Sequence, residues 1–130
     1  MFQVDDVDGM RVVRLRTYIA RNEGFLRRTL DFVSFMLAAV LAAPRLPRPD
    51  VVVATSPQFF AAVGGWLLSC IKRRPFVFEL GDLWPASIRA VGAMRAGAVL
   101  TAVEKLELFL YRRSAAVVAL TDTFKSDLVR

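Results

Sequence analysis

Phe76-Val77-Phe78-Glu79-Leu80-Gly81-Asp82-Leu83-Trp84-Pro85 is the stretch that decides the fold of this chain. An apolar run of β-favouring residues ends at a Gly-Asp pair, and a Trp-Pro pair follows. This pattern is typical of a buried parallel strand whose carboxyl end opens into a cleft. Ligands of open α/β sheets bind just outside such strand ends. We therefore expect Asp82 and Trp84 to serve more than packing.

Strands and helices alternate on both sides of this stretch. The predicted strands cover residues 51–54, 75–80 and 115–120, and the predicted helices cover residues 58–71, 98–113 and 123–130, with a short helix from Ser87. Ser56 is the expected N-cap of the first helix, with Pro57 at its first position, and Thr121 is the expected cap of the last. This order predicts an α/β fold with a Rossmann-like parallel sheet and helices on both faces.

Two elements are expected before residue 50. Residues 2–7 and 10–15 flank Asp8-Gly9, a strong hairpin signal because both turn residues tolerate positive φ. Residues 25–43 follow a helical pattern that prolines 44–49 end, with one apolar face made of Leu26, Leu30, Val33, Leu37 and Val40. Three more large apolar residues widen this stripe beyond one packing surface: Phe32, Phe35 and Met36.

Composition excludes several classes of chemistry. The chain has 130 residues, 55% of them hydrophobic and 23% charged, which fits a folded domain with a core and excludes disorder. It has no histidine, which excludes Ser-His and Cys-His nucleophile schemes, and its single cysteine excludes an internal disulfide. No glycine-rich dinucleotide motif, phosphate-binding loop or metal-ligand spacing is present. We expect no metal and no bound cofactor.

Positive charge is unevenly distributed. The net charge is +6, and residues 11–49 hold eight arginines against Glu23 and Asp31. Lys72-Arg73-Arg74 forms a second basic cluster. Such patches attract phosphates, anionic lipid headgroups or nucleic acid, or they are simply a solvated surface.

Residues 51–71 allow two interpretations. They form 21 residues without a charge, followed by Lys-Arg-Arg, which suits an integral membrane helix. However, Thr55-Ser56-Pro57-Gln58 interrupts the run after a β-favouring start. We therefore favour a buried strand, a turn and a helix over a membrane span.

Several side chains near the predicted strand ends are suited to binding. The Asp82 carboxylate can accept a hydrogen bond from a sugar hydroxyl, with an Asx turn or helix cap as the alternative. Trp84 can form a stacking surface or can close the loop as a core residue. Ser56 ends its own strand and faces the same cleft.

The remaining carboxylates are assigned structural roles. Glu79 lies within a strand and needs a cation if it is buried, and Arg89 would fit. Glu104 and Glu107 are predicted to form surface ion pairs with the basic residues of their helix, which are Lys105, Arg112 and Arg113. Gly64-Gly65 is predicted to allow close packing of its helix on a strand.

Residues 75–91, with Glu79, Asp82-Leu83-Trp84-Pro85 and Ser87, resemble the family-4 glycosyltransferases of GT-B fold. The bacterial branch that builds exopolysaccharide, O-antigen or colanic-acid repeat units is the most similar. The likeness extends to residues 50–57, 104–113 and 117–121. It implies a hexosyltransferase-type enzyme of cell-surface polysaccharide biosynthesis, transferring sugar from a nucleotide-sugar donor to a saccharide acceptor, in particular a polyprenyl-diphosphate-linked one.

The resemblance also implies a domain organisation. Residues 1–130 would be part of the N-terminal, acceptor-side domain, with a glycine-rich first strand upstream and a donor domain downstream. Such a fragment should be inactive alone. By this resemblance Asp82 would orient the acceptor hydroxyl, Trp84 would shape the sugar site, and Ser56, Gly81 and Ser87 would bind substrate. The chain departs from the family in lacking a cleft-loop histidine and in having Gly81 where the branch often has arginine.

Lipid-linked acceptors would place the enzyme at a membrane surface. Arg21, Arg27 and Arg28, with exposed phenylalanines, are predicted to dock a cytoplasmic, peripheral protein on an anionic membrane. We expect no nucleic-acid partner. The other alternative is a non-enzymatic α/β module that binds anionic polymers through its basic face.

Overall fold

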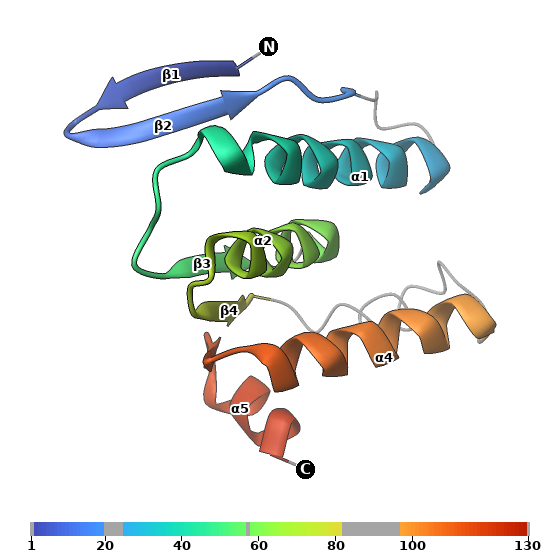
Figure 1. Ribbon diagram of the computed structural model, residues 1–130. Helices are drawn as coiled ribbons and strands as arrows, with labels where there is room; N and C mark the ends of the chain where they lie inside the picture. Colours follow the sequence, from blue (N-terminus) through green and yellow to red (C-terminus); the bar gives the residue numbers. More distant parts are fainter. Residues whose placement is uncertain (1, 20–24, 57, 82–96, 130) are drawn as a thin grey trace.

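The computed structural model describes residues 2–19, 25–56, 58–81 and 97–129. Its elements follow the chain from a hairpin and a long helix into a β–α–β–α–β–α series (Figure 1). The elements are β1 (Phe2–Val7), β2 (Met10–Leu15), α1 (Phe25–Ala42), the 3-10 turn η1 (Ala43–Arg45), β3 (Val52–Thr55), α2 (Phe59–Lys72), β4 (Phe76–Leu80), α4 (Ala98–Arg113), β5 (Ala116–Ala119) and α5 (Asp122–Val129).

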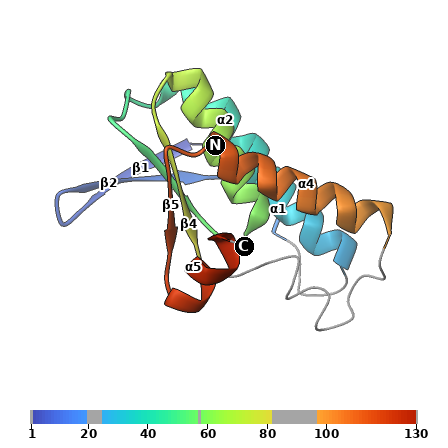
Figure 2. The ribbon, with the colours of Figure 1, turned by 90° about the horizontal axis from the view of Figure 1, so that it is seen from below.

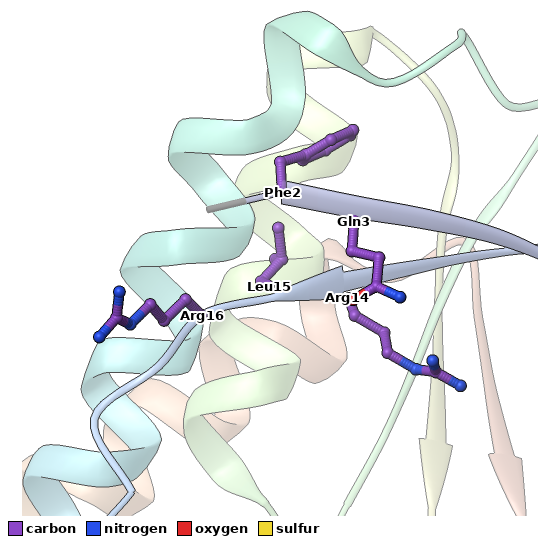
Figure 3. A pocket seen from close by; sticks show the side chains of 5 residues that line it. All are labelled: Phe2, Gln3, Arg14, Leu15 and Arg16. Atoms are coloured by element: carbon purple, nitrogen blue, oxygen red, sulfur yellow. The ribbon is translucent and has the colours of Figure 1, made fainter.

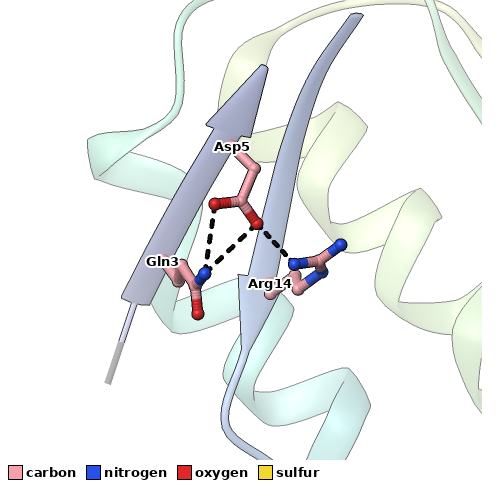
Figure 4. Close-up of polar contacts among 3 residues, drawn as sticks. All are labelled: Gln3, Asp5 and Arg14. Carbon is pink, nitrogen blue, oxygen red and sulfur yellow. Dashed lines mark hydrogen bonds and ion pairs between the residues drawn. The ribbon is translucent and has the colours of Figure 1, made fainter. Parts of the chain in front are cut away.

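The predicted hairpin is confirmed. β1 and β2 pair antiparallel, and Asp8 and Gly9 have φ of 52° and 80°, as a two-residue turn of this hand requires. The Gly9 N–H donates to Asp6 Oδ1 at 3.1 Å. On one face of the ribbon Asp5 accepts from both Gln3 and Arg14, so an ion pair links the two strands (Figure 4).

Helix α1 forms where the pattern predicted it, but its leucine face is not a packing face. Leu26, Leu30 and Leu37 are 77%, 57% and 51% exposed. The helix packs on α2 through another side, where Met36 lies against Gly64 (Figure 1). Of the five residues of the predicted apolar face, the three leucines are exposed while Val33 and Val40 are half-buried, because periodicity locates an apolar face but not the part of it that packs.

A three-stranded parallel sheet carries the second half of the chain. The order is β3-β4-β5, and Val53, Val77 and Ala116 lie in register across it. Helices α2 and α4 connect the strands, and α5 follows β5. The predicted α/β, Rossmann-like fold with its parallel sheet is confirmed, but the two crossover helices do not cover both faces as expected.

Both crossover helices lie on the same side of the sheet (Figure 2). They cover the buried face formed by Phe76, Phe78 and Leu80. Trp66 of α2 meets Phe109 of α4 edge to face at 5.0 Å. Successive right-handed crossovers that step in one direction place their helices on one face, which explains this arrangement. The other face is the more open one, with Val53 57% and Val118 46% exposed.

The two glycines of α2 allow close packing, as predicted. A Cβ on Gly65 would lie 2.6 Å from the Cβ of Ala54 in β3, too close for any side chain. A Cβ on Gly64 would lie 3.2 Å from Met36 Cγ. Gly65 therefore allows α2 to pack closely on the sheet, and Gly64 allows α1 to pack closely on α2.

Residues 51–71 fold mainly as β3 and α2 rather than as one helix. Within the described ranges, no helix combines the length and the hydropathy needed to cross a bilayer.

Candidate functional site

The carboxyl ends of β3 and β4 are tied together at Ser56 and Gly81. The Ser56 N–H donates to the Glu79 carbonyl at 3.0 Å, which continues the ladder one residue beyond β3. The Gly81 N–H donates in turn to Ser56 Oγ at 2.9 Å. Ser56 is buried. The hydroxyl thus holds the first residue after β4 at a fixed position on the edge where α/β sheets bind ligands.

The prediction that Ser56 caps the following helix is wrong. Helix α2 begins at Phe59 with Gln58 at its N-cap, and the Gln58 side chain makes no capping hydrogen bond. The Ser56 hydroxyl accepts from the neighbouring strand's Gly81 instead. Capping needs the hydroxyl one residue before the helix, and here the helix starts three residues later.

Gly81 is required at its position by space. A Cβ there would lie 2.5 Å from the Ser56 carbonyl oxygen and 3.7 Å from Leu120 Cδ1. The chain therefore needs a residue without a side chain where the ends of β3, β4 and β5 meet. This explains why an arginine does not occupy position 81.

The other predicted substrate contacts follow Gly81 along the chain. Asp82, Trp84 and Ser87, together with Arg89 and the short helix expected from Ser87, lie outside the described residues. Of the predicted substrate-binding residues, the structure brings Ser56 and Gly81 together. Glu79 is half-buried on the open face of the sheet.

The prediction that Glu107 forms a surface ion pair is wrong. Glu107 is buried, and the Tyr111 hydroxyl donates to its Oε1 at 2.8 Å. Burial raises the pKa of the Glu107 carboxyl, the Tyr111 hydrogen bond lowers it in part, and the nearby Glu104 charge raises it. Burial and the same carboxylate raise the pKa of the Tyr111 hydroxyl. The i, i+4 spacing of these two residues was the available signal.

Arg28 lies on the exposed side of α1 near its start. Its guanidinium carbon stands 5.6 Å from the centre of the half-buried Phe32 ring. Arg27 is exposed beside it, and the exposed leucines of α1 occupy the adjoining face. Arg21 lies outside the described residues. The exposed apolar residues of α1 include Phe35, in line with the expected phenylalanines, and the leucines Leu26, Leu30, Leu37 and Leu41.

Two adjoining hollows lie where the hairpin meets α1. One, of about 460 Å³, is lined by Phe2, Gln3, Arg14, Leu15 and Arg16, with Phe2 and Leu15 paired across the strands (Figure 3). The other, of about 390 Å³, shares three of these residues and adds Leu41 and Arg45. Arg16 therefore lines both hollows, with Arg14 in the first and Arg45 in the second.

In the part of the chain that the structure describes, no three metal-ligating side chains come together.

Comparison with known proteins gives one match. A family model described as a glycosyl transferase 4-like domain matches residues 2–130. No curated protein and no solved structure matches the chain significantly. Because the match covers the hairpin, α1 and the whole β–α series, the chain belongs to the glycosyl transferase 4-like domain family.

Proposed function

We propose that the chain is the acceptor-side part of a hexosyltransferase. In the complete enzyme it would help move a sugar from a nucleotide-sugar donor to a polyprenyl-diphosphate-linked saccharide in cell-surface polysaccharide biosynthesis. The observation that carries the proposal is the family match over residues 2–130, and the strand-end geometry of Ser56 and Gly81 supports it. The donor domain would be supplied elsewhere, so the chain alone is expected to be inactive.

The proposed roles follow from position. Asp82 directly follows Gly81, and its carboxylate would orient the acceptor hydroxyl, with Trp84 and Ser87 shaping the sugar site. Because the Ser56 hydroxyl already accepts from Gly81, Ser56 would act by positioning the strand end. Catalysis would rest on orientation of the two substrates and on stabilisation of the leaving diphosphate.

Asp82→Asn in the complete enzyme tests this proposal. The substitution keeps the size of the side chain and removes its charge, so kcat should fall by about 10²-fold or more, while Tm stays within about 2 °C. Release of nucleoside diphosphate from the donor gives the rate. Asp50→Asn is the matched control, because Asp50 is exposed just before β3, at the opposite edge of the sheet. Wild-type kcat in Asp82→Asn would remove Asp82 from the site.

We further propose that the exposed face of α1 docks on an anionic membrane, which would make the enzyme peripheral at the cytoplasmic surface. Leu26, Leu30 and Leu37 supply apolar area, and Arg27 and Arg28 supply charge. Neither signal alone binds strongly, but together they give useful affinity.

Co-sedimentation with vesicles tests the docking. Leu30→Ser should weaken binding to vesicles of anionic phospholipid, and Arg27→Ala with Arg28→Ala should weaken it mainly at low salt. Leu108→Ser is the matched control, because Leu108 is a similarly exposed leucine on α4. Equal loss in Leu30→Ser and Leu108→Ser would contradict a specific docking face.

A further inference from the structure

A further basic hollow lies at the opposite edge of the sheet from Ser56 and Gly81. There α2 and α4 end, and the chain turns into β4 and β5. The Arg74 N–H donates to the Ser69 carbonyl at 2.9 Å, and the Ala115 N–H donates to the Phe76 carbonyl at 2.7 Å. The first bond closes the turn after α2, and the second holds the turn after α4 beside it at the start of the strands.

Between the turns is a hollow of about 430 Å³. Arg73, Arg74 and Arg113 line it, and none of the described residues that line it is acidic. Trp66 and Phe76 form apolar parts of its wall. Three arginines therefore border one hollow, with no carboxylate among the described residues that line it.

The arginines are not neutralised in another way within the described ranges. The ion pair found there joins Arg14 to Asp5, in the hairpin. Arg74 Nε is buried and has no hydrogen-bond partner in this part of the chain. Leaving this N–H unsatisfied is costly, and no acceptor among the described residues offsets that cost or the charge of Arg74.

Helix ends explain part of this cluster. Arg113 lies in the last turn of α4, and Arg73 follows α2 with φ of 51°, and cations are favoured near helix C-termini. The preference of cations for helix C-termini does not explain why two helix ends share one hollow. It also does not explain why Arg74 Nε has no acceptor among the described residues. Lys72 is a basic residue at the same helix end whose charge has a partner within the protein. Its Nζ donates to the Leu46 carbonyl, and Lys72 does not line the hollow.

The Arg113 side chain also packs on an aromatic ring. Its guanidinium carbon lies 5.4 Å from the centre of the Phe109 ring, and Phe109 packs against Trp66. Stacking on a ring fixes the plane of a guanidinium and leaves the N–H groups at its rim to donate.

We propose that Arg73, Arg74 and Arg113 form a binding site for a phosphate group, separate from the proposed sugar-transfer site. Guanidinium forks match phosphate oxygens with paired, charge-assisted hydrogen bonds. Strand β4 separates Arg74 from Gly81, and at about 3.3 Å per residue its five residues put the two sites roughly 16 Å apart. The hollow has room for a phosphate or a diphosphate.

Calorimetric titration of the chain with inorganic phosphate and with diphosphate, at constant ionic strength, tests the site. We expect diphosphate to bind, and Arg113→Ala and Arg74→Gln each to weaken binding at least about tenfold. Arg112→Ala is the matched control, because Arg112 neighbours Arg113 but does not line the hollow. Arg113 is exposed, so its variant should fold even if Arg74→Gln does not.

Cys70 gives an independent readout. It is the single cysteine of the sequence, it is exposed, and it lines the hollow. Diphosphate should slow alkylation of Cys70 in the wild-type chain and in Arg112→Ala, but not in Arg113→Ala.

The source of the phosphate is decided by a second arm with vesicles that contain phosphatidic acid. Vesicle binding that is lost in Arg113→Ala, without binding of soluble diphosphate, would assign the site to a lipid headgroup. The proposal would be overturned if the chain bound neither soluble diphosphate nor the vesicles. It would also be overturned if Arg113→Ala and Arg112→Ala bound diphosphate equally. Asp82→Asn should leave this binding unchanged, so the outcome is independent of the sugar-transfer proposal.

Discussion

The Gly81 N–H donates to Ser56 Oγ at 2.9 Å, while the Ser56 carbonyl oxygen occupies the space that a side chain at position 81 would need. The two residues thus lock the ends of β3 and β4 by a bond and by contact. Ser56→Ala removes the acceptor and leaves the Gly81 N–H unpaired. We expect the free energy of unfolding to fall by about 1–3 kcal/mol, measured by urea denaturation.

The matched control for Ser56→Ala is Ser126→Ala. Ser126 is exposed on α5, where its hydroxyl donates to the Asp122 carbonyl. That exposed carbonyl can be hydrated instead, so the change should cost less than about 0.5 kcal/mol. An equal fall in the free energy of unfolding in both variants would show that the Gly81–Ser56 hydrogen bond stabilises the fold no more than an exposed one does.

The two glycines of α2 should respond differently to alanine. Gly65→Ala places a Cβ 2.6 Å from that of Ala54, so helix and strand must separate, and stability should fall by about 1–3 kcal/mol. Gly64→Ala meets the flexible Met36 side chain at 3.2 Å and gains up to about 1 kcal/mol of helix propensity. Thermal unfolding of both variants measures the difference. A Gly65→Ala protein as stable as Gly64→Ala would contradict the packing.

Glu107 should make stability depend on pH. Because burial raises its pKa above the ordinary 4.5, the folded protein holds this proton more tightly than the unfolded chain. The stabilisation is present in full below about pH 4.5 and is lost as pH rises through the raised pKa. Glu107→Gln keeps an acceptor for Tyr111 and removes the charge, so it should be more stable than wild type at pH 7.

Tyr111→Phe is the complementary variant for this pair. It removes the hydrogen bond that favours the ionised carboxylate, so the pKa of Glu107 should rise further and the loss of stability with pH should steepen. Urea denaturation between pH 4 and 8 measures both variants. If the stability of Glu107→Gln depended on pH as the wild type does, the Glu107 carboxyl would not be the cause of that dependence.

The start of α5 offers a test of capping. The Phe124 N–H donates to Thr121 Oγ1 at 3.2 Å, as expected of an N-cap. Thr121→Ala should cost about 1 kcal/mol, measured by denaturation. Thr123→Ala is the control inside the same helix, and it should not destabilise comparably. A larger loss in Thr123→Ala would contradict the assigned cap.

The elements that the sequence predicted best depend on local signals. The Asp8-Gly9 turn fixes its hairpin, and helix 98–113 was predicted with the observed bounds. The errors concern partners that are distant along the chain. Ser56 has cap chemistry, but its hydroxyl accepts from a residue 25 positions away. Likewise, the helical period located the leucines of α1 but not the side that meets α2.

The candidate site was predictable only in part, for a similar reason. The end of β4 was correctly located from the change in composition after Leu80. The need for glycine at position 81 arises from the carbonyl of Ser56, which only the parallel pairing of β3 and β4 brings near. The carboxyl of Glu107 was misassigned because burial depends on how α4 packs.

The open face of the sheet determines how the isolated chain behaves in solution. Val53 and Val118 are exposed there, and β3 is an edge strand of the three-stranded sheet. Exposed apolar β-surface beside an unpaired edge promotes aggregation. Preparations of the 130-residue chain should therefore lose solubility as concentration rises, and a polar replacement at Val53 or Val118 is the first change to make for handling it.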